Sequence, residues 1–359
     1  MNHGPYLNLA QRLDSLPNGF PPTEDGIELK ILAKLFTPEE ASLAASLRLS
    51  LEAPEQIAGR LGVDAQDTRT MLKSMARRGL ISIGRIDGGL GYGLMPFVVG
   101  IYEMQVSHLD TEFAQLFEDY YQRSFGKMLS IQPAVHRVIP VGESVRTDIA
   151  IQPYENATEI VKKAQAWGVL DCICRKQKAL IGDPCEHPVD ICMALSQQPG
   201  AYDGNPVVHA LTLEEALATL QRAAQAGLVH SVSNSLHGQS YICNCCTCCC
   251  GILRAYKEFG RASAFVKSDY YMKVDEQKCI GCATCINRCQ FDALVLQNGI
   301  MTVNKNCIGC GVCAMDCSED ALQLVNRNPK ELSKPPKSDR NWYIKRMLSR
   351  LTIPWRLIK

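Results

Sequence analysis

The sequence predicts an α+β protein made of several regions that differ in composition. Hydrophobic residues fill 46% and charged residues 21% of the 359 positions, which is typical of a globular chain with two or three domains. Helix-capping signals occupy the first quarter, cysteine runs alternate with helical segments in the middle, and a repeat dominates the last third. We therefore expect four regions: residues 1–94, 95–269, 270–326 and 327–359.

The first region carries the signals of three short helices followed by a strand pair. Residues 37–40 form a capping box with proline at the first helical position, and Pro54 begins the next helix. Asp64 is placed to cap a third helix that runs to Arg78, and the glycine-rich residues 80–93 follow as two strands. This order resembles a winged helix-turn-helix, with residues 80–93 as the wing.

We do not expect DNA recognition to be the main task of this segment. From Val63 to Asp87, five basic residues stand against three acidic ones, whereas a working DNA reader is clearly basic. Asp64 and Asp67 lie at the start of the presumed recognition helix, the end that usually meets base edges. The charge pattern therefore favours a docking or dimerisation module.

The middle region mixes helical and extended signals and is predicted to be a cysteine-rich α/β segment. We expect a helix near residues 109–121 and extended chain over the proline-punctuated residues 135–154. Two more helices are predicted, from Glu155 to Trp167 and from Glu214 to Ala226, the second with Thr212 as its cap. Each of these two helices leads toward a group of cysteines.

Eight cysteines near the C-terminal end form two copies of one motif. Each copy has the spacing C-x2-C-x2-C-x3-C, and Cys307 follows Cys279 by 28 residues, as do the other pairs. The two copies are Cys279, Cys282, Cys285 and Cys289, and Cys307, Cys310, Cys313 and Cys317. Three thiolates on a tight loop reach one 4Fe-4S cubane, while the fourth begins a helix that faces the other way and reaches a second cubane.

Ligation is therefore expected to be crossed between the two copies. Cluster I would use Cys279, Cys282, Cys285 and Cys317, and cluster II would use Cys307, Cys310, Cys313 and Cys289. Zinc is the alternative, because two C-x2-C pairs also make a four-thiolate zinc site. Zinc, however, requires neither the third cysteine of each copy nor the crossed fourth one.

Residues 270–326 resemble the bacterial-type two-cluster ferredoxins on these motifs. The resemblance implies two low-potential 4Fe-4S clusters. The sequence departs from the family pattern at Gln290 and Ser318, where proline usually follows the fourth cysteine. This departure removes no ligand.

Ten further cysteines precede the repeat. They are Cys172, Cys174, Cys185 and Cys192, and the run Cys243, Cys245, Cys246, Cys248, Cys249 and Cys250. The first four supply a complete four-thiolate set, with residues 172–175 in a loop, and we expect a third iron–sulfur cluster there. Zinc, and ligation shared with the later run, are the alternatives. Arg175 would offset the charge of a thiolate-bound cluster, and His187 and His230 are weaker ligand candidates.

The later run cannot direct all its side chains at one cubane, because adjacent side chains diverge. Some of its members are therefore structural, or they share two clusters with the earlier set, which would give a fourth cluster. We take Cys243, Cys245, Cys246 and Cys249 as the candidate ligands. Residues 249–251 are also similar to the CCG motif of heterodisulfide reductase catalytic subunits, although a second motif of that type is absent.

The order of these features is similar to that of long ferredoxin-type proteins of anaerobic bacteria and archaea, whose implied role is electron transfer. No phosphate loop or dinucleotide fingerprint is found in the sequence, so a flavoprotein or another oxidoreductase is the expected partner. A transcription regulator gated by clusters, and a catalytic reductase with an unusual cluster at residues 243–250, are the rival hypotheses.

The last 26 residues form a basic tail, with eight Lys or Arg against one Asp, on a chain of net charge +1. Ile344, Met347, Leu348 and Leu351 recur at helical spacing, which favours a helix that docks on a partner or a membrane surface, or one that packs on its own body. No signal peptide or membrane span is predicted, so we expect a cytoplasmic protein, with a peripheral place at the inner membrane face as a variant.

Overall fold

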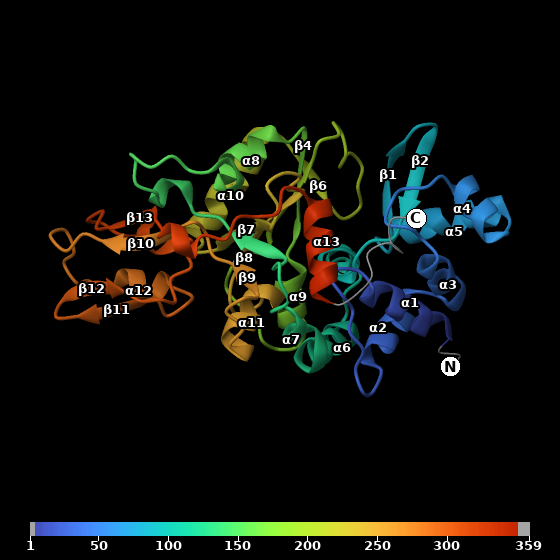
Figure 1. The fold of residues 1–359 in the computed structure, drawn as a ribbon, viewed down its shortest axis with the longest axis horizontal. Coiled ribbons are helices and arrows are strands. Elements are labelled where there is room, and N and C mark those ends of the chain that lie inside the picture. Colours follow the sequence, from blue (N-terminus) through green and yellow to red (C-terminus); the bar gives the residue numbers. More distant parts are fainter. Residues whose placement is uncertain (1–3, 351–359) are drawn as a thin grey trace. The chain divides into compact units, whose positions relative to one another are not determined.

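The computed structural model describes residues 4–350, and the chain forms two compact units (Figure 1). The first unit contains the residues up to Met128, Lys176–Pro184 and the residues from Tyr343 onward. The second unit contains Leu129–Arg175 and Cys185–Trp342, and it holds all 18 cysteines. The boundary at Met128 lies inside the region expected at residues 95–269.

The first unit is mainly helical and carries one hairpin. Its elements are α1 (Gly4–Asp14), α2 (Ile27–Leu35), α3 (Pro38–Ala45), α4 (Pro54–Leu61), α5 (Ala65–Arg77), β1 (Ser82–Ile86), β2 (Gly89–Gly93), α6 (Thr111–Tyr120) and α7 (Gly126–Met128). The predicted capping box is present, since Glu40 N–H donates to Thr37 Oγ1 at 3.2 Å and Thr37 N–H to Glu40 Oε2 at 3.0 Å. Asp64 caps α5 by accepting the N–H of Asp67 at 2.8 Å.

Aromatic side chains fill the core of this unit beside α6. Tyr102 and Phe117 stack with ring centroids 3.7 Å apart, and Phe20 contacts Phe97 and Tyr120 at centroid distances of 4.5 and 5.0 Å. Phe20, Phe97 and Tyr102 lie outside α6 and pack on Phe117 and Tyr120, which belong to it. They anchor α6, the helix that the sequence predicts near residues 109–121.

The second unit is built on a seven-stranded sheet with the order β6-β4-β5-β8-β7-β3-β9. The strands are β3 (His136–Val138), β4 (Ala166–Asp171), β5 (Asp190–Ser196), β6 (His209–Leu211), β7 (Val229–Ser233), β8 (Tyr241–Cys245) and β9 (Phe265–Val266). All neighbours pair antiparallel except β3 and β9. The helices α8 (Ala157–Lys163) and α10 (Leu213–Gln225) pack together against it, burying Ile160, Val161 and Leu220 with strand residues (Figure 1).

Two boundaries differ from those predicted. The helix expected to reach Trp167 ends at Lys163, because residues 166–171 pair as β4 between β5 and β6, and Trp167 Nε1 donates back to the Val161 carbonyl at 2.8 Å. Residues 173–175 do not lie in a loop but in the first turn of α9 (Ile173–Leu180). Helix α10 is as predicted, with a capping box between Thr212 and Glu215.

The last third of the second unit is a small module of four strands. Here β10 (Tyr270–Val274) pairs with β13 (Leu322–Asn326), and β11 (Leu294–Gln297) pairs with β12 (Ile300–Val303). Two short cysteine-bearing helices, α12 (Thr284–Arg288) and a 3-10 turn at Val312–Ala314, lie beside these strands. Asn298 and Gly299 turn the predicted hairpin with φ values of 51° and 79°. We call residues 270–326 the repeat module.

Helix α13 (Asp339–Ser349) covers the described part of the basic tail. Trp342 and Met347 are buried, while Leu348 of the predicted apolar face is 59% exposed. Arg346 is buried, with its Nε donating to the Pro17 carbonyl at 2.8 Å, and Arg350 pairs with Asp14 at 2.6 Å. Leu351 lies outside the described residues. None of the helices within residues 4–350 is long and apolar enough to cross a membrane.

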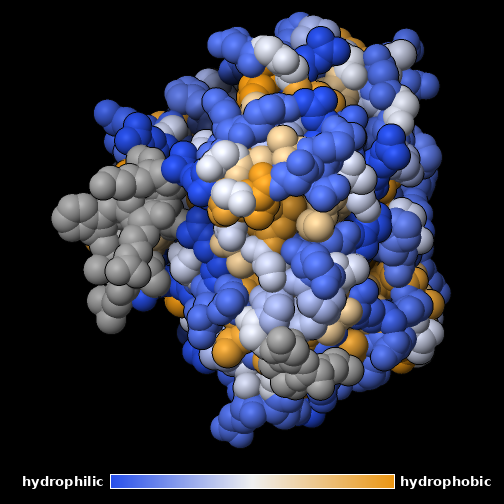
Figure 2. All heavy atoms as spheres, turned by 90° about the vertical axis from the view of Figure 1, so that its right-hand side faces the viewer, coloured by the Kyte–Doolittle hydropathy of each residue, from blue (hydrophilic) through white to orange (hydrophobic). Residues whose placement is uncertain are grey.

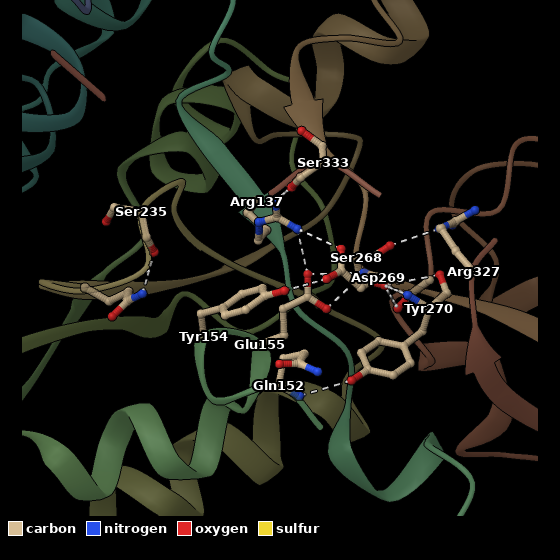
Figure 3. Close-up of polar contacts among 12 residues, drawn as sticks. Arg137, Gln152, Tyr154, Glu155, Ser235, Ser268, Asp269, Tyr270, Arg327 and Ser333 are labelled. Atoms are coloured by element: carbon tan, nitrogen blue, oxygen red, sulfur yellow. Dashed lines mark hydrogen bonds and ion pairs between the residues drawn. The ribbon is translucent and has the colours of Figure 1, made fainter. Parts of the chain in front are cut away.

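A buried ionic group joins the sheet to Asp269, the residue that directly precedes the repeat module (Figure 3). Arg137 of β3 contacts Glu155 Oε1 at 2.7 Å and Asp269 Oδ1 at 3.2 Å. Glu155 accepts the Asp269 N–H at 2.9 Å, and the Tyr154 hydroxyl donates to Asp269 Oδ2 at 2.6 Å. Arg137 also donates to the Ser333 carbonyl beyond β13. We call Arg137, Glu155 and Asp269 the ionic triad; Arg137 is 1% exposed and Glu155 fully buried.

The triad predicts a pH dependence of stability. Burial, only partly offset by Arg137, raises the pKa of Glu155 from its ordinary 4.5 to about 7. The native state therefore holds this proton more tightly than the unfolded chain, so the contribution is complete below about pH 4.5 and is lost as the pH rises through 7. The full difference is at most about 3 kcal/mol.

The measurement is urea unfolding under anaerobic conditions at pH 5 and pH 8, followed by tryptophan fluorescence. Glu155→Gln carries no titrating proton, so its midpoint should fall less between the two pH values than that of the unmodified protein. If the urea midpoint fell equally between pH 5 and pH 8 in the two proteins, the assignment of this pH dependence to Glu155 would be wrong.

Candidate metal centres

The eight cysteines of the repeat line two separate cavities. One cavity is lined by Cys279, Cys282, Cys285 and Cys317, with Met301 and Leu322 behind them. The other is lined by Cys289, Cys307, Cys310 and Cys313, with Met272 and Phe291 behind them. Each cavity thus takes three thiols from one copy of the motif and the fourth from the other copy, the combination predicted for crossed ligation.

Backbone conformation repeats along with the cysteines. Gly281 and Gly309 occupy equivalent positions with φ of 68° and 74°, in the left-handed region. A Cβ at Gly281 would lie 2.2 Å from the Gly299 carbonyl oxygen, and one at Gly309 would lie 2.1 Å from that of Tyr270. Only glycine therefore lets each cysteine loop close against its neighbouring strand.

Backbone N–H groups point at four of the sulfurs. Met301 N–H donates to Cys279 Sγ and Met272 N–H to Cys307 Sγ, each at 3.4 Å. The fourth cysteines are also bonded, Cys289 by Ala293 N–H at 3.4 Å and Cys317 by Ala321 N–H at 3.3 Å. Such donors stabilise a thiolate-bound anionic cluster and help to set its potential.

The repeat cysteines fit an iron–sulfur cluster chemically as well as by position. Burial raises the pKa of Cys310 to about 12 and also raises that of Cys313. Buried thiols of this kind lose their protons when a metal binds them, because the metal supplies the compensating positive charge. The cavity that holds Cys310 and Cys313 therefore suits a bound cationic iron core better than four free thiols.

The upstream cysteines form two groups, not one four-thiolate set. The sequence predicts that Cys172, Cys174, Cys185 and Cys192 hold one cluster, with ligation shared with the later run as an alternative, and the structure places Cys185 beside the later run. Cys185, Cys246, Cys248 and Cys249 have all their sulfur atoms within 4.8 Å of one another. We call these four residues the loop tetrad. Cys185 follows Pro184 in the loop between α9 and β5.

The remaining six form a second group on the sheet. The sheet group consists of Cys172, Cys174, Cys192, Cys243, Cys245 and Cys250. Cys172 is hydrogen-bonded to Cys174 and Cys192, and Cys245 to Cys243 and Cys250. Sheet register brings them together: Met193 of β5 pairs with Ile242 of β8, which places the next residues, Cys192 and Cys243, side by side.

Two members of the sheet group lie at the N-terminal ends of helices. Cys174 lies in the first turn of α9, and Cys250 is the N-cap of α11 (Gly251–Phe259). The Gly251 N–H bonds Cys174, and the N–H groups of Ile252 and Leu253 bond Cys250. The N–H groups at the start of α11 therefore point toward the sulfurs of Cys174 and Cys250, which favours negative charge at this position.

Arg175 lies between the two groups. It is 2% exposed, and its Nη2 donates to the Asn244 carbonyl at 2.9 Å and approaches Cys246 Sγ at 3.5 Å. Burial lowers the pKa of Arg175, but the nearby thiols of Cys172 and Cys246 outweigh this and raise it. This side chain is therefore a fixed positive charge beside both groups, as the sequence suggested.

The two histidines near the cysteines differ in their surroundings. Hydrogen bonds with Cys246 and Cys248 raise the pKa of His187 to about 10, so it is a cation beside the loop tetrad. Burial lowers the pKa of His230 to about 4, and its Nδ1 lies 2.6 Å from Asn244 Oδ1. His230 is therefore a neutral side chain held by an amide.

Two cysteines were missed as candidate ligands. Cys248 belongs to the loop tetrad and Cys250 to the sheet group. Strand alternation gives a signal only for Cys243 and Cys245, which lie on one face of β8. The positions of Cys248 and Cys250 depend on the turn between β8 and α11, which has no comparable period.

Comparison with known proteins identifies one segment. Residues 272–295 match the family model of a 4Fe-4S binding domain. Comparison with curated proteins and with solved structures gives no match. The matched segment contains the first copy of the motif, Cys279 to Cys289, so the chain contains a ferredoxin-type 4Fe-4S domain. The match supports an iron–sulfur cofactor and, in general terms, iron–sulfur electron transfer.

Proposed function

We propose that this protein is an electron carrier, or the electron-transfer subunit of an oxidoreductase, that passes single low-potential electrons through two 4Fe-4S clusters. The observation that carries the proposal is the pair of cavities, each lined by four thiols drawn from both copies of the motif. Cluster I would occupy the first cavity and cluster II the second. When bound, each cluster supplies a site that gains and loses one electron.

The two cluster sites differ in solvent exposure, which suggests where a redox partner exchanges electrons with the repeat module. Cys282 at the site of cluster I is exposed, and the neighbouring Ile280 is 66% exposed, whereas none of the four cysteines at the site of cluster II is exposed. Val295 and Leu296 of β11 add exposed apolar surface to the repeat module. We propose that a flavoprotein or another oxidoreductase docks there and exchanges electrons with cluster I.

The charges of the segment from α3 to β2 favour electron transfer over DNA-dependent regulation. Of its basic side chains, Arg69 is paired with Glu55, and Arg78 is paired with Glu40. These pairings neutralise charge that a DNA reader would direct at phosphate. The side of the molecule that carries α4 and α5 is largely hydrophilic, with some hydrophobic atoms near its centre (Figure 2). A protein-docking role for this segment fits these features better.

The test is reductive titration of the anaerobically purified full chain. We expect at least two one-electron reductions with 4Fe-4S EPR signals, and reoxidation by an added acceptor such as oxidised benzyl viologen without a change in iron content. Potentials of such clusters span about −700 to +450 mV, and low values are expected here. Clusters that assemble but take up no electrons from dithionite would refute the proposal.

A further inference from the structure

We propose that the loop tetrad, Cys185, Cys246, Cys248 and Cys249, binds a single zinc ion. This site is separate from the proposed electron-transfer clusters and does not depend on them. The four thiols come from two segments about 60 residues apart, the loop after α9 and the turn between β8 and α11.

The spacing of the sulfur atoms selects a single ion. All four lie within 4.8 Å of one another, and 3.8 Å separates Cys248 Sγ from Cys249 Sγ. A tetrahedral zinc ion with Zn–S bonds of about 2.3 Å keeps its sulfurs about 3.8 Å apart. The cysteine sulfurs around a 4Fe-4S cubane lie farther apart, because each of them binds a different iron of the cluster.

The repeat module provides an internal comparison. Within residues 4–350, no three of its cysteine sulfurs come within 4.8 Å of one another, and its two quartets surround cavities. The same chain therefore shows two kinds of thiol quartet, one open enough for a cubane and one contracted to the size of a single ion.

The surroundings suit a closed structural site. Cys246 and Cys249 are buried, and four sulfurs leave no open coordination position for a substrate. Four thiolates around Zn²⁺ leave a net charge of −2, and the buried Arg175 guanidinium at 3.5 Å from Cys246 Sγ offsets part of it.

The site would also fix a loop that supports cluster II. Thr247, inside the tetrad turn, donates its N–H to Gln290 Oε1 at 2.7 Å, and Gln290 Nε2 donates to the Gly227 carbonyl at 2.6 Å. Gln290 follows Cys289, the crossed ligand of cluster II. The glutamine that replaces the usual proline thus links the ligand loop of the repeat module to the tetrad.

The experiment is metal analysis and zinc K-edge X-ray absorption on the anaerobically purified full chain. We expect about one zinc per chain, bound by four sulfurs at about 2.3 Å. Zinc below a quarter equivalent, zinc bound by nitrogen or oxygen, or iron at the tetrad would overturn the proposal.

A matched pair of variants locates the ion. Cys248→Ser should lose the zinc and keep the iron of the repeat module, whereas Cys282→Ser, at another exposed cysteine, should lose iron and keep the zinc. Zinc retained in Cys248→Ser with unchanged sulfur coordination would overturn the site assignment. Failure of electron uptake would leave the zinc content unchanged, so the two proposals fail separately.

Discussion

Cys289→Ala is expected to damage the same cluster as Cys307→Ala, although the two residues belong to different copies of the motif. Cys289, Cys307, Cys310 and Cys313 line one cavity, and Cys289 Sγ is held there by the Ala293 N–H at 3.4 Å. Removing either thiol takes one of four ligands from cluster II, so we expect loss of one to four irons from that cluster. Cluster I should stay intact.

The readout is the EPR spectrum of the reduced protein together with its iron content. Cys279→Ala and Cys317→Ala are the matched controls, since both line the other cavity and should share a second, different spectrum. If Cys289→Ala instead gave the spectrum of Cys279→Ala, ligation would follow the copies of the motif and crossed ligation would be wrong.

Arg137→Met is expected to cost about 3–5 kcal/mol of stability, because it leaves two buried carboxylates without their counter-charge. Glu155 and Asp269 lie at 2.7 and 3.2 Å from Arg137 Nη1. The loss should be larger at pH 8 than at pH 5, because Glu155, with a pKa of about 7, is mostly ionised at the higher pH.

Urea unfolding followed by the visible absorbance of the clusters measures this effect, because the triad joins the sheet to Asp269, which directly precedes the repeat module. Arg69→Met is the control, since its pair with Glu55 is solvent-exposed and contributes little to stability. The double variant Arg137→Met with Glu155→Gln should recover part of the loss. An unchanged midpoint for Arg137→Met would show that the triad does not hold the module.

Local signals in the sequence predicted the parts of the fold that depend on neighbouring residues. The capping boxes at Thr37 and Thr212 act over three residues, and the structure contains both. The cysteine repeat was equally informative, because the spacing of each copy alone dictates which thiols face the same way. The cavities bring together the sets that this spacing predicts.

The seven-stranded sheet could not be predicted from the sequence, because its strands pair with partners far away along the chain and several strands are very short. Strand β9 has two residues, and β3, with three, pairs with β7 nearly a hundred residues later. The position of Cys185 beside the later cysteine run could not be predicted for the same reason. The pairing of β5 with β8 determines which cysteines lie near Cys185, and no local sequence pattern predicts that pairing.

The join between the sheet and the repeat module is short. Strand β9 ends at Val266 and β10 begins at Tyr270, and Ser268 between them is bonded to the Ile308 carbonyl at 3.1 Å and to that of Gly309 at 2.7 Å. Such a join cannot act as a flexible tether on which a carrier domain swings between donor and acceptor. Transfer within this unit would then be tunnelling over fixed distances, with a rate that does not respond to solvent viscosity.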